Sequence, residues 1–177
     1  MKRQELEHVL RAASAIVNHP DIVVIGSQAV LGQFPDAPAE LLVSMEADVF
    51  PKGRPELSIQ IDGAIGERSM FHETFGYYAH GVGETTATLP TGWEERLVPI
   101  RNENTGGATG WCLEVHDLAV SKLVAGREKD LNFVGGLLKH RMADPKRITA
   151  LIQILPTSED VREQTRRRFG RLTSSAT

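Results

Sequence analysis

The fold of this chain is decided by an early run that reads Ile22-Val23-Val24-Ile25-Gly26-Ser27-Gln28-Ala29-Val30-Leu31-Gly32. Its first four residues are apolar without alternation, which is typical of a short strand buried on both faces. The Gly-Ser pair then turns the chain into a short helical stretch over residues 28–33. We therefore expect a strand, a Gly-Ser turn and a helix in immediate succession.

Upstream of this unit, residues 3–18 carry apolar side chains at helical spacing, which predicts an amphipathic helix. Pro20 cannot continue a helix, so this helix should end before the strand. Downstream, a helix is expected to begin at Pro55 and to end before Gly66, because these residues suit the two ends of a helix. Short apolar runs bounded by glycine and proline predict strands over residues 45–50, 75–82, 96–101 and 110–115.

The pattern changes after Val115, where apolar residues recur at helical spacing. This spacing predicts four helices, over residues 116–125, 127–139, 143–155 and 158–171. The sequence therefore indicates an α+β fold, with a sheet core over residues 1–115 and a C-terminal helical segment over 116–172 packed on that core. Residues 173–177 are small and mostly polar, and we expect them to form a frayed tail.

The composition is that of an ordinary globular domain, with 41% hydrophobic and 24% charged residues among 177. The formal net charge is −3, so any contact with nucleic acid would come from a local basic patch. One cysteine excludes an intramolecular disulfide and a cysteine-rich zinc site. No apolar run reaches the roughly 18 residues of a membrane span, and the N-terminal stretch contains Glu5 and Glu7. We expect a cytoplasmic protein with no signal peptide and no membrane partner.

Two carboxylates stand two residues apart in Glu46-Ala47-Asp48. On a strand they would point to the same face, with their Cα atoms roughly 7 Å apart. Like charges on one face repel each other unless a cation lies between them, and carboxylate oxygens suit Mg²⁺ or Mn²⁺. The pair therefore indicates a metal site. The competing interpretation is the solvated acidic face of a strand.

The Gly26-Ser27 turn is a second candidate site. Backbone N–H groups at a helix start bind anions, and glycine lets a phosphate approach the backbone. Ser27 would either bond a phosphate or cap the helix, and an ordinary N-cap is the competing interpretation. The turn is not a Walker loop, because the sequence contains no G-x-x-x-x-G-K-[ST] motif.

The third candidate lies in the run DLAVSKLVAGREKD, which covers residues 117–130. Lys122 sits among apolar residues of a predicted helix, where its ammonium would either reach a triphosphate or extend to solvent. Arg127 and Asp130 would form part of a charged elbow between two helices. The competing interpretation is a salt-bridged helix turn with Asp117 as the N-cap.

In this order the motifs GS, S-x-E-x-D and D-L-x-x-x-K-x-x-A-x-R-x-K-D resemble those of the minimal nucleotidyltransferases of the DNA polymerase beta superfamily, over about residues 20–140. More narrowly, the chain is similar to the group that contains the type IV abortive-infection toxins and their uncharacterised relatives. The resemblance implies a nucleotidyltransferase-like mixed sheet flanked by helices. It also implies that Gly26 and Ser27 hold the β- and γ-phosphates of an NTP, and that Glu46 and Asp48 bind catalytic Mg²⁺ or Mn²⁺.

The same resemblance implies roles for the third motif. Lys122 would contact the phosphates of the nucleotide with Arg127 beside it, and Asp130 would orient or support that site. Three features depart from the family pattern, which usually has two aspartates and a third carboxylate on a later strand. The spacing from the Gly-Ser turn to the acidic pair is long, with an insertion around residues 33–42. Here Glu46 takes the place of the first aspartate, and the predicted later strand offers His80. Four glutamates, in no obvious register, are the other candidates for the third carboxylate: Glu84, Glu94, Glu95 and Glu114.

These features predict metal-dependent transfer of a nucleoside monophosphate from an NTP to an acceptor hydroxyl, with release of pyrophosphate. The acceptor classes are RNA, protein and small molecules. By resemblance, the chain would be a toxin whose partner is an antitoxin protein. Two other interpretations stay open: a catalytically inactive module of the same fold that binds a partner protein or RNA, and a metal-dependent phosphohydrolase.

Overall fold

The computed structural model describes residues 1–174 of the chain. These residues form two compact units. The first unit comprises residues 1–86 and 97–114, and the second comprises residues 87–96 together with the chain from Val115 onward. Among the described residues, no helix combines the length and the apolar character needed to cross a membrane.

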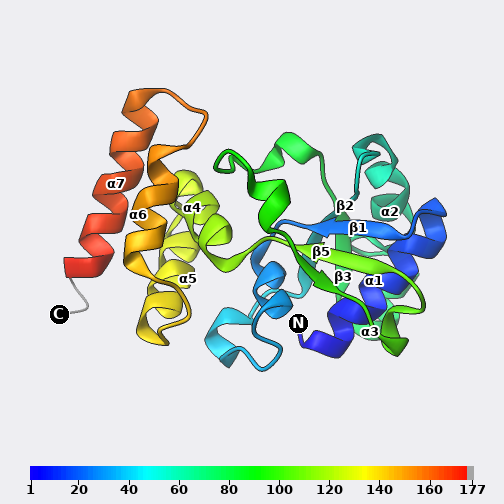
Figure 1. The fold of residues 1–177 in the computed structure, drawn as a ribbon. Helices are drawn as coiled ribbons and strands as arrows, with labels where there is room; N and C mark the ends of the chain where they lie inside the picture. The colour runs from blue at the N-terminus through cyan, green and yellow to red at the C-terminus, as the bar shows by residue number, and fades with distance from the viewer. Residues whose placement is uncertain (175–177) are drawn as a thin grey trace. The chain divides into compact units, whose positions relative to one another are not determined.

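The first unit is built on a five-stranded mixed sheet (Figure 1). Its strand order is β3-β2-β1-β5-β4, so β1 lies at the centre. β1 pairs antiparallel with β2 and parallel with β5, β2 pairs parallel with β3, and β4 pairs antiparallel with β5. The strands are β1 (Asp21–Val24), β2 (Glu46–Pro51), β3 (Tyr78–Gly81), β4 (Val98–Ile100) and β5 (Thr109–Cys112).

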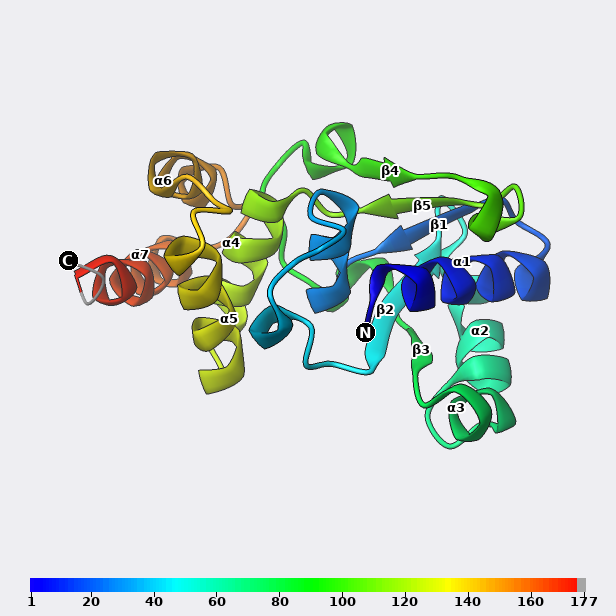
Figure 2. The same ribbon diagram turned by 90° about the horizontal axis from the view of Figure 1, so that it is seen from below.

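Two helices, α1 (Arg3–Val17) and α2 (Ser58–Ile65), pack against each other and against one face of this sheet (Figure 2). The apolar stripe of α1 is buried, as its helical spacing predicts. The helix ends where Asn18 adopts a left-handed conformation with φ 48°, two residues before Pro20. Close approach of α1 requires a glycine in β5, because a Cβ on Gly110 would lie 2.3 Å from Leu10.

Several predicted boundaries in this unit differ from the observed ones. The helix expected from Pro55 begins as a 3₁₀ turn before α2, and the strands expected over 96–101 and 110–115 are the shorter β4 and β5. The short helical stretch predicted over residues 28–33 is the 3₁₀ helix η1 (Ser27–Gly32). The strand predicted over residues 75–82 is shorter, because α3 (Met70–Phe75) precedes it. The Ser69 side chain caps α3 by accepting from the backbone N–H of His72, and Gly76, with φ 77°, ends it. Four further 3₁₀ turns in this unit are η2 (Ala39–Leu41), η3 (Pro55–Leu57), η4 (Glu84–Thr86) and η6 (Glu103–Thr105), whereas η5 (Trp93–Arg96) belongs to the second unit.

The second unit contains the helices α4 (Val115–Ala125), α5 (Glu128–Lys139), α6 (Pro145–Gln153) and α7 (Glu159–Ser174). The α+β prediction, with a mixed sheet and a helical C-terminal segment, is confirmed. The last helix extends further than expected, because Thr173 and Ser174, assigned to a frayed tail, belong to α7. The rest of that predicted tail, residues 175–177, lies outside the described residues.

The close approach of β5 and α1 leads to a test of the packing. We expect Gly110→Ala to destabilise the protein by about 1–3 kcal/mol, because the added methyl overpacks a fixed contact. The matched control is Gly63→Ala in α2, where a Cβ meets nothing within 4 Å. That change should stabilise the protein by up to about 1 kcal/mol, since alanine is the better helix former. Urea unfolding measures both, and equal stabilities for the two variants would contradict the packing.

Candidate functional site

The acidic pair lies on one face of β2, and the strand predicted over residues 45–50 is confirmed. Glu46 and Asp48 are two residues apart, so their side chains leave the strand in the same direction. Each places a carboxylate oxygen within 4.8 Å of the other and of a ring nitrogen of His80. The three side chains are 37%, 26% and 50% exposed, so the cluster is partly sheltered yet accessible from solvent.

The Gly-Ser turn lies directly against this cluster. The backbone N–H of Ile25 donates to the carbonyl of Asp48 at 3.0 Å, which continues the β1–β2 pairing up to the turn. A Cβ on Gly26 would stand 2.0 Å from Oδ2 of Asp48, so only glycine leaves room for the carboxylate. Gly26 is the N-cap of η1 and Ser27 its first residue, so the alternative in which Ser27 is the N-cap is wrong.

β3 contributes two side chains to the same face. In the parallel register, Tyr78 lies opposite Glu46, and His80 lies opposite Asp48. The Tyr78 hydroxyl donates to Oε2 of Glu46 at 2.8 Å. The Nδ1 atom of His80 lies 3.1 Å from Oδ1 of Asp48 and 3.7 Å from Oε1 of Glu46. Two carboxylates and an imidazole thus converge, and this donor set fits a divalent cation.

Within the described part of the chain, no third carboxylate belongs to this cluster, and His80 takes the third position. None of the four glutamates considered from the sequence contributes to it: Glu84, Glu94, Glu95 and Glu114. Sequence reasoning missed Tyr78 as the partner of Glu46. Its signal was the two-residue spacing from His80, which places both on one face of the strand.

The electrostatics of the site show how unfavourable the two carboxylates are by themselves. Burial raises the pKa of Asp48 above its ordinary value, and the charge of Glu46 raises it further, although His80 opposes the shift. Burial and the hydrogen bond to Glu46 raise the pKa of Tyr78 to about 12. Tyr78 therefore keeps its proton at neutral pH and acts as a hydrogen-bond donor to Glu46.

The third sequence motif lies in the second unit, where Asp130 forms ion pairs with two basic side chains. Its carboxylate lies 3.1 Å from Nζ of Lys122 and 2.6 Å from Nε of Arg127. Asp130 is 1% exposed and Lys122 is 13% exposed, whereas Arg127 is 61% exposed. Asp117 is a buried residue inside α4 paired with Arg96, so the alternative of Asp117 as an N-cap is wrong.

Burial alone would raise the pKa of Asp130. Hydrogen bonds from Arg127 and Lys122, together with their positive charges, outweigh burial and hold the pKa below its ordinary value. Asp130 is therefore ionised at neutral pH and fixes the ammonium of Lys122. The Lys122 ammonium also lies 5.6 Å from the ring centroid of Phe133, within the range of a cation–π contact.

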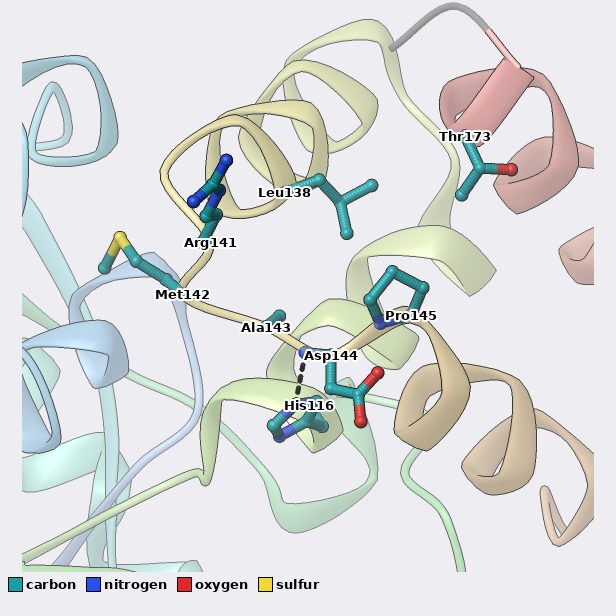
Figure 3. Close-up of a pocket in the computed structure, with 8 residues that line it drawn as sticks. All are labelled: His116, Leu138, Arg141, Met142, Ala143, Asp144, Pro145 and Thr173. Atoms are coloured by element: carbon teal, nitrogen blue, oxygen red, sulfur yellow. Dashed lines mark hydrogen bonds between the residues drawn. The ribbon is translucent and has the colours of Figure 1, made fainter. Parts of the chain in front are cut away.

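The second unit also contains a pocket of about 450 Å³ near the start of α6 (Figure 3). Nε2 of His116 accepts a hydrogen bond from the backbone N–H of Asp144 at 2.8 Å at its edge. No site residue predicted from the sequence is among the residues that line it: His116, Leu138, Arg141, Met142, Ala143, Asp144, Pro145 and Thr173.

The raised pKa of Asp48 leads to a prediction about stability. A carboxyl group whose pKa is raised by folding favours the folded state at low pH, and this advantage is lost as pH rises through the folded-state pKa. At neutral pH, Asp48→Asn should therefore melt at a higher temperature than the wild-type protein without divalent ions. The exposed Asp36 provides the control, since Asp36→Asn removes the same charge and should melt like the wild type. A lower melting temperature for Asp48→Asn would contradict this electrostatic description.

The lowered pKa of Asp130 leads to the opposite dependence. Its stabilising effect is present above the unfolded-state pKa of about 3.9 and is lost as pH falls through the lower folded-state value. Asp130→Asn should lower the free energy of unfolding by about 3 kcal/mol at pH 7, because it leaves Lys122 without its charged partner. The cost should shrink below about pH 4. Urea unfolding across pH checks this, with the exposed Asp160→Asn as the near-neutral control.

Comparison with known proteins supplies the context for these residues. Residues 4–152 match the family model described as "Nucleotidyltransferase of unknown function (DUF6036)". No curated protein matches the chain, and no solved structure matches it. The match covers most of the sequence, including the Gly-Ser turn, the acidic pair and the lysine–arginine–aspartate motif. The chain therefore belongs to this family of nucleotidyltransferases of unknown function.

Proposed function

We propose that the chain transfers a nucleoside monophosphate from an NTP to an acceptor hydroxyl in a metal-dependent reaction. The acceptor oxygen forms a bond to the α-phosphorus as the bond to the bridging oxygen breaks. Pyrophosphate leaves, and the hydroxyl proton passes to solvent. One observation carries the proposal: the carboxylates of Glu46 and Asp48 meet beside the Gly26 turn in a member of a nucleotidyltransferase family.

In this proposal the residues of the first unit have distinct roles. Gly26 and Ser27 hold the β- and γ-phosphates, where the lack of a side chain at Gly26 leaves the backbone accessible. Glu46 and Asp48 hold Mg²⁺ or Mn²⁺, and such an ion stabilises charge on the transferring phosphoryl group. Tyr78 positions Glu46, because its hydroxyl occupies Oε2 and leaves the other oxygen directed toward His80.

Lys122 is proposed as a cationic ligand of the nucleotide's phosphates, with Arg127 as a second cation. The support is the order of motifs in the sequence together with family membership. Asp130 acts as a positioning residue, because its buried carboxylate holds both cations in place. The resemblance to abortive-infection toxins extends the proposal to a toxin role with an antitoxin protein as partner.

A second candidate function is a module of the same fold that binds a partner protein or RNA without catalysis. One observation favours it: among the described residues, the third member of the cluster is His80 and not a carboxylate. Without that carboxylate, deprotonation of the acceptor hydroxyl loses a nearby acceptor for the proton. A transferase would turn over NTP and release pyrophosphate, whereas a binding module would not.

The proposal is tested by incubating the purified chain with each α-labelled NTP, Mg²⁺ or Mn²⁺, and total cellular RNA or protein. We expect label to enter one of the polymers, or a small product, with stoichiometric release of pyrophosphate. Asp48→Asn should reduce transfer by at least about 100-fold, since it removes charge stabilisation at the transferring group. Asp36→Asn is the matched control and should transfer at the wild-type rate.

The other outcomes separate the competing functions. Nucleotide or RNA binding without pyrophosphate release would favour the non-catalytic module. Release of labelled monophosphate without any acceptor would favour a phosphohydrolase. Equal transfer by the wild type and Asp48→Asn would refute the assignment of the acidic pair.

A further inference from the structure

We propose that His80 is a direct ligand of the metal ion in this site and that its imidazole makes the site select Mn²⁺ over Mg²⁺. The inference rests on the metal site of the proposed function. It goes beyond that site in assigning a nitrogen ligand and an ion preference. Neither follows from the family pattern, in which the third group is a carboxylate.

The orientation of the carboxylates supports this assignment. Oε2 of Glu46 accepts from Tyr78, and Oδ2 of Asp48 lies over Gly26. The oxygens that face the imidazole are therefore Oε1 of Glu46 and Oδ1 of Asp48, at 3.7 and 3.1 Å from Nδ1 of His80. The three atoms form one compact set of donors, drawn from two adjacent strands in fixed register.

The distances between these donor atoms are compatible with all three binding one metal ion. Two ligands at adjacent corners of an octahedral ion with bonds of about 2.1 Å are about 3 Å apart. The separation between Nδ1 and Oδ1 is already at that value. His80 would reach the ion through Nδ1 without a change in strand register, since β3 holds it opposite Asp48.

The chemistry of the donors decides which ion is preferred. Mg²⁺ favours oxygen ligands and keeps its waters, whereas imidazole binds first-row transition ions. Mn²⁺, as a first-row transition ion, accepts an imidazole ligand beside the carboxylates more readily than Mg²⁺ does, so of these two ions it matches the mixed set better.

The test measures metal binding without nucleotide and without activity. Mn²⁺ is added to the wild type, His80→Asp, His80→Asn and the control His140→Asn, and pulsed EPR records nitrogen coupling to the bound ion. We expect ¹⁴N coupling in the wild type and His140→Asn, and none in the His80 variants. Calorimetric titration should give Mn²⁺ binding tighter than Mg²⁺ on the order of tenfold, and His80→Asp should remove most of that difference.

Circular dichroism checks folding, and His80→Asn serves if His80→Asp, which adds a third carboxylate, does not fold. Bound Mn²⁺ without nitrogen coupling, or an unchanged preference in the folded His80 variant, would overturn the inference. So would the absence of Mn²⁺ binding. Nitrogen-coupled Mn²⁺ in a protein that transfers no nucleotide would support the inference while refuting the proposed function, and Mg²⁺-supported transfer without nitrogen coupling would do the reverse.

Discussion

The first unit depends on the antiparallel pairing of β1 with β2. That register sets Val24 opposite Val49 and lets the N–H of Ile25 reach the carbonyl of Asp48. The Gly26 turn then meets the carboxylate of Asp48 with no room for a side chain between them. A shift of one residue would turn the acidic pair toward the opposite face, against the helices, because side chains alternate along a strand. The candidate site therefore exists only while this register holds.

Around that fixed point, the site combines two opposed requirements. Burial raises the pKa of Asp48, and the charge of Glu46 on the same face raises it further, so the ionised pair is unfavourable by itself. The neighbouring strand partly offsets this repulsion with a hydroxyl donor and an imidazole. Neither group neutralises both charges, so the site is predisposed to bind a cation. Functional sites commonly keep unfavourable charge interactions that the binding of a ligand relieves.

The second unit resolves its buried charges differently. Asp130 is almost fully buried, but two cations lie within hydrogen-bonding distance of its carboxylate. Charge and hydrogen bonding outweigh burial there, so its pKa moves down rather than up. The two aspartates, Asp48 and Asp130, therefore show opposite pKa shifts from one principle: the balance of burial against compensating charge. The same interaction orders Lys122, the residue proposed above as a ligand of the phosphates.

Elements whose signals are local could be predicted from the sequence. Three such signals depend on neighbouring residues alone: the periodicity of α1, the unbroken apolar run of β1, and the two-residue spacing of Glu46 and Asp48. The α+β class and the nucleotidyltransferase family follow from these elements and from the order of the motifs. The helix α3 escaped prediction because its six residues are too few for periodicity to register.

The residues that complete the site are set by long-range strand pairing, which the sequence does not reveal. Tyr78 and His80 lie about 30 residues beyond the acidic pair, and no local pattern states that β3 pairs parallel with β2 or in which register. That pairing replaces an expected carboxylate with a histidine. The pairing of Lys122 with Asp130 likewise depends on how α4 meets α5. Local spacing fixes the direction of a side chain along its own element, whereas its partners are fixed by long-range strand and helix packing.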